Sequence, residues 1–100
     1  MLSHSVFFTL HDDSPAARAK LIGDCRKYLT DIPGITFFAV GTLVDDLSRP
    51  VNDKGFHVGL NVVFTNRAAH DAYQVDERHQ QFMAENKPTW KQVRVFDFAD

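Results

Sequence analysis

The sequence has a single cysteine, no long hydrophobic run and no block of basic residues. One cysteine excludes an intramolecular disulfide and a cysteine-based zinc site. The apolar runs are too short to span a membrane, and the first ten residues lack the basic start of a signal peptide. The formal net charge is −2, and no lysine or arginine tract is long enough to follow a phosphate backbone. We therefore expect a cytoplasmic protein that contacts neither membranes nor nucleic acid.

Several signatures of catalytic and cofactor sites are also missing. The sequence contains no glycine-rich phosphate loop, no nucleophile elbow and no dinucleotide fingerprint. His11, His57 and His70 fall on different elements or faces, and no histidine pair has the helical i, i+4 spacing with a carboxylate partner. We expect no metal site and no cofactor. Cys25 has apolar neighbours at helical spacing, which favours a core thiol over a nucleophile.

What is present indicates one ordinary globular domain over residues 1–100, with 44% hydrophobic and 24% charged residues. Strands are predicted where apolar residues alternate, and helices where they recur every three or four positions after a capping residue. In chain order these are a strand over 4–10, a helix from Ser14 to about Ile32, strands over 35–43 and 57–64, helices over 66–73 and 76–86, and a strand over 92–98. We interpret the polar segment 44–56 as a plain connection rather than a lid.

The order strand, helix, strand, strand, helix, strand is that of the ferredoxin-like βαββαβ unit. It predicts an α+β fold with a four-stranded antiparallel sheet and helices on one face. The other face should then carry an apolar patch larger than monomers usually expose. Pairing with a second copy, sheet on sheet, would bury it, so we expect a homodimer. The residues expected on that face are Phe7, Thr9, Val63, one of Phe37 and Phe38, and one of Val93 and Val95.

Tyr73 and His79 lie six residues apart, a spacing that would place them on different faces of one continuous helix. A break at Val75 and Asp76 removes this difficulty, because the two side chains then lie on separate short helices that can converge. His79 shares the inward stripe of the second helix with Phe82 and Met83.

Several stretches together resemble the stress-responsive A/B barrel, or Dabb, family. They are "HSVFFTLHDD", "IPGI" followed by "VG", "GFHVGLNVVF", and "AYQVDERHQQF" ahead of "WKQVRVFDF". The resemblance covers nearly the whole chain and implies a dimeric α+β barrel with a cavity between sheet and helices in each subunit. In members of the family a tyrosine and a histidine six residues apart line that cavity. Most members have no assigned activity, and one group closes a linear polyketide by an aldol condensation.

The resemblance makes His79 and Tyr73 the candidate catalytic residues. A partly buried His79 would be neutral at pH 7 and available as a base, Tyr73 could orient a substrate carbonyl, and His4 could hydrogen-bond either one. His4, Val58, Phe82 and Met83 are the candidate ligand-binding residues. Val58 takes the place of a second pocket histidine of the cyclases, with His57 on the opposite side of its strand.

These departures weaken the case for a cyclase. A pocket tyrosine on the first helix of the cyclases also falls at Cys25 here. The leading expectation is therefore a dimer that binds or modifies a small, partly apolar molecule. A noncatalytic structural or stress-response dimer and a polyketide-cyclase-like enzyme with a histidine base remain the alternatives.

Overall fold

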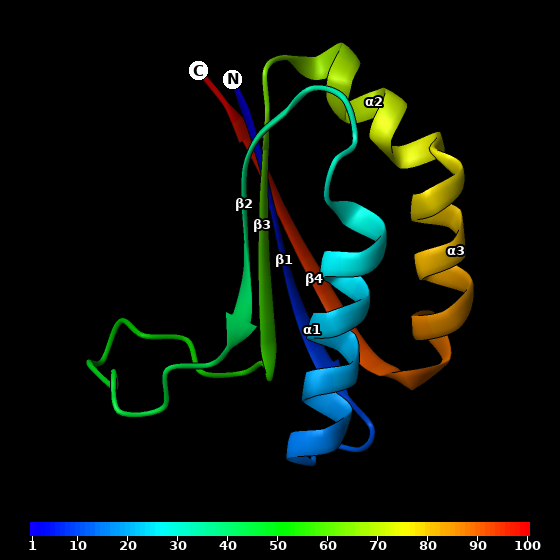
Figure 1. The fold of residues 1–100 in the computed structure, drawn as a ribbon. Helices are drawn as coiled ribbons and strands as arrows, with labels where there is room; N and C mark the ends of the chain where they lie inside the picture. Colours follow the sequence, from blue (N-terminus) through cyan, green and yellow to red (C-terminus); the bar gives the residue numbers. More distant parts are fainter.

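The computed structural model describes residues 1–100 and confirms the predicted α+β, ferredoxin-like fold (Figure 1). Four antiparallel strands form one sheet in the order β2-β3-β1-β4. No helix has the length and apolar character needed to cross a membrane. The elements are β1 (Leu2–Leu10), α1 (Pro15–Leu29), β2 (Ile35–Thr42), β3 (Val58–Phe64), α2 (Arg67–Val75), α3 (Glu77–Asn86), a 3₁₀ turn η1 (Lys87–Thr89) and β4 (Trp90–Ala99).

Helix α1 begins where the sequence predicts and ends earlier. The Ser14 hydroxyl accepts a hydrogen bond from the Ala17 amide at 3.2 Å, as expected of a capping residue. The helix ends at Leu29 rather than near Ile32, because Thr30 is extended and Asp31 takes a positive φ of 60°. Bends at Thr30 and Asp31 therefore replace the last helical turn that the sequence predicted.

The connection from α1 to β2 requires glycine at position 34. Gly34 has a φ of 93°, a conformation that side chains disfavour. A Cβ atom there would lie 2.4 Å from the Cβ of Ala69 on α2. This close approach packs the turn directly against the second helix.

The core lies between the helices and one face of the sheet. Alternate residues of β1 and β3 are buried, and cross-strand pairs such as Val6 with Leu60 place them on the same side. Helix α1 contributes Leu21, Cys25 and Leu29 to this core. The predicted facing of the first and third strands is thus confirmed.

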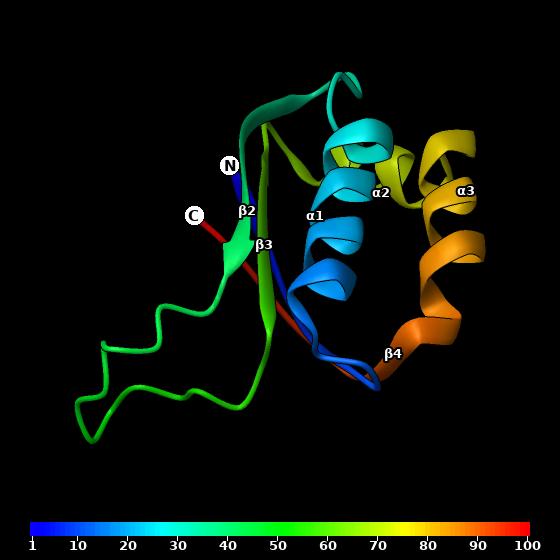
Figure 2. The same cartoon turned by 60° about the horizontal axis from the view of Figure 1, so that its bottom comes forward.

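The other face of the sheet carries no helix (Figure 2). Its largest exposed side chains are Phe37 on β2 and Phe96 and Phe98 on β4, with 56%, 52% and 67% of their surfaces accessible. Phe7 lies between Phe96 and Phe56, with ring centroids 5.8 and 4.9 Å away. We call Phe7, Phe37, Phe96 and Phe98 the open-face patch.

The prediction that Val93 or Val95 lies on this face was wrong. Val93 and Val95 pair with Phe8 and Val6 and therefore face the helices. The intervening phenylalanines take the outer positions, since the two faces of a strand alternate. Phe38 packs against the core, which leaves Phe37 as the outward residue of its pair.

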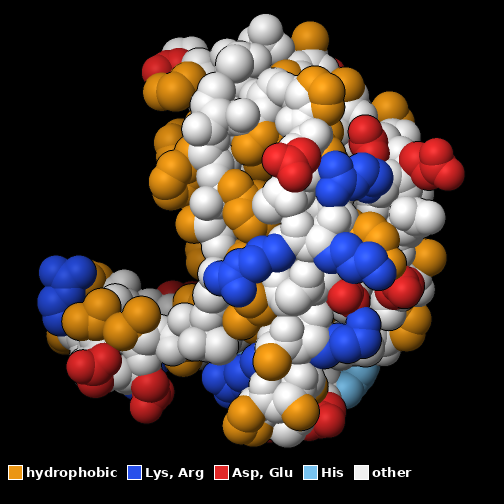
Figure 3. All heavy atoms as spheres, viewed as in Figure 1, with side chains coloured by type: hydrophobic (Ala, Val, Ile, Leu, Met, Phe, Trp, Pro, Cys, Tyr) orange, Lys and Arg blue, Asp and Glu red, His pale blue; other side chains and the backbone are white.

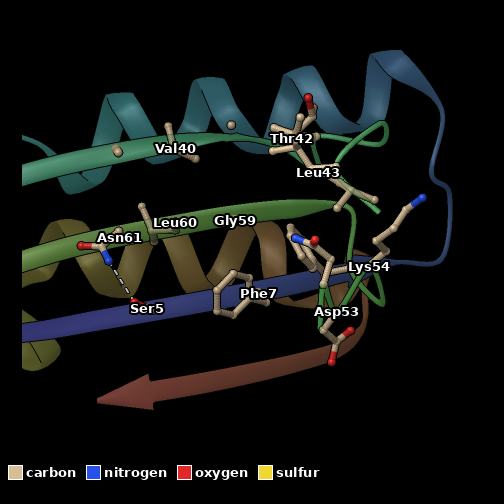
Figure 4. A pocket seen from close by; sticks show the side chains of 16 residues that line it. Ser5, Phe7, Val40, Thr42, Leu43, Asp53, Lys54, Gly59, Leu60 and Asn61 are labelled. Atoms are coloured by element: carbon tan, nitrogen blue, oxygen red, sulfur yellow. Dashed lines mark hydrogen bonds between the residues drawn. The ribbon is translucent and has the colours of Figure 1, made fainter. Parts of the chain in front are cut away.

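Residues 43–57 form a long loop between β2 and β3 that projects away from the side of the sheet that the helices cover (Figures 1 and 2). Figure 3 shows it standing out from the body of the molecule. A groove of about 470 Å³ lies between this loop and the open face, where Phe7 and Gly59 meet Asp53 and Lys54 (Figure 4). The loop does not line the cavity on the helix side.

Candidate functional site

A second cavity, of about 390 Å³, lies between the sheet and the helices. It is lined by residues of β1, β4, α2 and α3, together with Leu29 of α1 and Leu60 of β3. Most of the lining is hydrophobic. The polar side chains are His4, His70, Tyr73, Gln74, His79 and Asp97. We call it the helix-side cavity.

The break between α2 and α3 brings Tyr73 and His79 together. Asp76 adopts an extended conformation after Val75, and its carboxylate accepts a hydrogen bond from the Arg78 amide at 2.8 Å to start α3. The two rings lie edge to face with centroids 4.8 Å apart. The sequence reasoning that separated them onto two helices is therefore confirmed, while their catalytic role stays a prediction.

Tyr73 is almost fully buried, with 1% of its surface exposed. Burial raises the pKa of its phenol, with a smaller contribution from Cys25. The hydroxyl is therefore protonated at neutral pH and can act as a hydrogen-bond donor.

His79 is 9% exposed, and its Nδ1 atom is buried without a hydrogen-bond partner. Burial is the main cause that lowers its pKa, and His4 adds to this effect while Asp76 opposes it. The imidazole is therefore neutral at pH 7. A neutral imidazole with an unpartnered nitrogen can accept a proton or a hydrogen bond from a bound molecule.

His4 lines the cavity as expected, but its partner differs from the expectation. Its Nδ1 atom lies 2.5 Å from the Oδ1 atom of Asp97, whereas its ring centroid lies 6.1 Å from that of Tyr73. Cross-strand pairing of β1 with β4 sets His4 directly opposite Asp97, and this position decides the contact. The His4 and His70 ring centroids are 5.3 Å apart.

The sequence analysis did not place Asp97, His70 or Trp90 among the cavity residues. Asp97 could have been found as the one acid in "VFDFA", on the same side of the strand as Val93 and Val95. Trp90 packs against Phe8 with ring centroids 4.9 Å apart, and its Nε1 atom is buried without a partner.

The other candidate ligand-binding residues divide into two groups. Phe82 and Met83 line the cavity as expected. Val58 does not, because it is completely buried and Leu60 takes the lining position on β3. Cys25 is buried too, and burial raises the pKa of its thiol to about 12, which agrees with a core role.

A family model described as the Stress Responsive A/B Barrel Domain matches residues 2–100. The chain belongs to this family. Among curated proteins none matches it.

Solved structures extend the likeness of this Dabb chain. A Dabb family protein with a ferredoxin-like fold from Mesorhizobium loti is 25% identical, with a TM-score of 0.80 over 99% of this chain and 95% of that one. A dimeric ferredoxin-like protein of unknown function from Thermobifida fusca is 18% identical, with a TM-score of 0.81 over 99% and 90%. A hydroxynitrile lyase from Passiflora edulis is 21% identical, with a TM-score of 0.77 over 97% and 90%. At these identities the last two show a shared fold alone.

Proposed function

We propose that this Dabb protein binds a small, partly apolar molecule in the helix-side cavity and that His79 acts on it as a general base. The observation that supports this most directly is a cavity of about 390 Å³ lined mostly by apolar side chains, with His79, whose Nδ1 atom has no hydrogen-bond partner, among the lining residues. Cavities of this size and character suit small organic ligands.

The polar residues define the chemistry expected of the ligand. Tyr73 offers a protonated hydroxyl that can donate to a carbonyl or carboxylate oxygen. His79, kept neutral by burial, can take a proton from a hydroxyl group or from a carbon next to a carbonyl. Phe82, Met83 and Trp90 provide the apolar wall. The best match is an aromatic or polyketide-like molecule with one oxygenated end.

The comparisons support an enzyme only in part. One neighbour is a hydroxynitrile lyase, so this fold can carry catalysis, but other neighbours have no known function. Val58 and Cys25 stand where the resemblance to the cyclases would place a pocket histidine and a pocket tyrosine, so the proposal does not extend to aldol cyclisation. A noncatalytic dimer is the rival.

A thermal-shift screen of small aromatic and polyketide-like acids tests ligand binding. A ligand that binds only the native protein raises the melting temperature. For a ligand found in this way, His79→Ala should abolish turnover and leave the circular dichroism spectrum unchanged. His11→Gln, at an exposed histidine outside the cavity, is the matched control. A fold lost with His79→Ala, or full turnover in that variant, would contradict the role assigned to His79.

We also propose that the chain forms a homodimer through the open-face patch. Its exposed phenylalanines and the dimeric state described for structural neighbours support this. Phe98→Asp should shift the sedimentation coefficient from dimer to monomer, because it places a charge in a desolvated interface. Val75→Asp, at an equally exposed apolar residue on α2, should not. A wild-type protein that sediments as a monomer at micromolar concentration would refute the dimer.

We further propose a cytoplasmic location, which the free buried thiol of Cys25 supports.

A further inference from the structure

Three side chains from three separate elements meet at one end of the helix-side cavity. His4 lies on β1, His70 on α2 and Asp97 on β4, and one potential ligand atom of each lies within 4.8 Å of the others. Two imidazoles and one carboxylate are a common ligand set for divalent transition metals. We propose that His4, His70 and Asp97 form a binding site for a divalent transition-metal ion such as Zn²⁺.

The hydrogen bonds around His70 prepare it as a ligand. Its Nδ1 atom lies 3.0 Å from a carboxylate oxygen of Asp71. A carboxylate can only accept a hydrogen bond, so the imidazole carries its proton on Nδ1. The lone pair is then left on Nε2. The hydrogen-bond partner of Nε2 is the side-chain amide of Gln74 at 3.4 Å, a long interaction that a metal ion can replace. A carboxylate behind a metal-binding histidine fixes the ring and its tautomer in many metal sites.

The spacing of the ligand atoms is close to what a metal requires. Ligands about 2.0 to 2.1 Å from a tetrahedral ion lie roughly 3.3 Å from each other. One potential ligand atom of each residue lies within 4.8 Å of the others, and His4 Nδ1 lies 2.5 Å from Asp97 Oδ1. Shifts of the order of 1 Å in side-chain positions would equalise them. The ion would take the place of the hydrogen bond between His4 and Asp97.

The surroundings allow an ion to enter and to remain reactive. The His4 side chain is buried, whereas 44% of the Asp97 side chain is accessible, which gives a path from solvent. Asp71 adds a second negative charge beside the site, partly balanced by Arg67 at 2.9 Å. Three protein ligands leave a fourth position free for water or a ligand, the pattern of metal sites that carry out chemistry.

This site differs from our expectation of no metal, which rested on the placement of histidines on different elements and on the absence of a helical i, i+4 pair. The three residues are separated by 66 and 27 positions in the sequence, so no local motif announces them. Fold topology alone brings them together. The proposal does not depend on the organic ligand proposed above, because the metal would bind to the protein without it.

Metal titration of the untagged protein after treatment with a chelator tests the site. Zn²⁺ binding by calorimetry should give one ion per chain, with a micromolar or lower Kd. Co²⁺ should give the visible absorption bands of a tetrahedral site. Asp97→Asn and His70→Gln should each weaken binding by at least about tenfold, since each removes a ligand.

Matched variants keep this outcome interpretable. His11→Gln and Asp46→Asn change an exposed histidine and an exposed acid outside the site and should bind as wild type. Unfolding curves recorded in chelator verify that each variant is folded. Absence of binding, or equal weakening by site and control variants, would overturn the proposal. Organic ligands are screened in the presence of chelator, so that the screen tests organic-ligand binding independently of metal binding.

Discussion

Replacing His79 with phenylalanine should make the protein more stable, although the residue is buried. The Nδ1 atom of His79 has no hydrogen-bond partner, and such a group lowers the stability of the folded state. Phenylalanine keeps a ring at this position and removes the polar atoms. A side chain retained for function at a cost in stability should behave in this way.

The size of the effect follows from three contributions. Leaving a buried polar group unpaired costs about 1 to 3 kcal/mol. The edge-to-face packing on Tyr73, worth about 0.5 to 1.5 kcal/mol, is preserved by the new ring. The larger ring adds strain, but the adjoining cavity of about 390 Å³ offers room for it. We expect the free energy of unfolding to rise by about 1 kcal/mol near neutral pH, or roughly 4 to 8 °C in Tm for a domain of this size.

The stabilisation should grow as the pH falls. Burial lowers the pKa of His79 in the folded protein below the ordinary value of 6.5. Below that value the unfolded chain takes up a proton that the folded chain binds less readily, so the wild type loses stability as the pH falls toward the folded pKa. The phenylalanine variant lacks this loss. Its advantage should therefore be larger at about pH 5.5 than at about pH 7.5.

Urea unfolding of both proteins at one fixed protein concentration measures the difference, because the stability of a dimer depends on concentration. His79→Gln serves as the control, since it keeps polar atoms and should not stabilise. Two results would refute the reasoning: a His79→Phe variant less stable than wild type at both pH values, or an advantage that does not change with pH. Either would mean that solvent or protein satisfies the imidazole in solution.

Two further substitutions test the local structure that positions the cavity. Gly34→Ala should lower the free energy of unfolding by about 2 kcal/mol or more, because the residue has a positive φ and its new Cβ would clash with Ala69. Gly41→Ala is the control: a Cβ there meets open space, so thermal unfolding should show a far smaller loss. Asp76→Ala should lower the free energy of unfolding by about 1 kcal/mol, because it removes the N-cap of α3. Asp76→Asn should lower it less, since asparagine can still cap the helix. Equal losses for the two variants in urea unfolding would exclude a capping role.

The fold was predictable because its signals are local. Alternation identified β1 and β3, Ser14 and Asn66 marked helix starts, and the break at Asp76 explained the spacing of Tyr73 and His79. Each of these depends on residues a few positions apart. The physical causes, capping and alternation of faces, act over the same range.

The polar end of the cavity was not predictable in the same way. His4 meets Asp97 and His70 only because β1 lies between β3 and β4 and because α2 covers that end of the sheet. Assigning Val93 or Val95 to the outer face placed Asp97 on the wrong side as well, since residues two apart share a face. One error of parity on the last strand therefore removed the acid from the predicted cavity.

The same parity links the two surfaces proposed for this protein. In β4, Asp97 faces the helix-side cavity opposite His4, while its neighbours Phe96 and Phe98 face outward onto the open-face patch. A slip of one residue would exchange these positions, putting a phenylalanine in the cavity and a carboxylate in the apolar patch. Both changes are unfavourable, since one fills the polar end of the cavity and the other buries a charge on dimer formation. The register of this single edge strand is therefore needed for the cavity and for the proposed dimer alike.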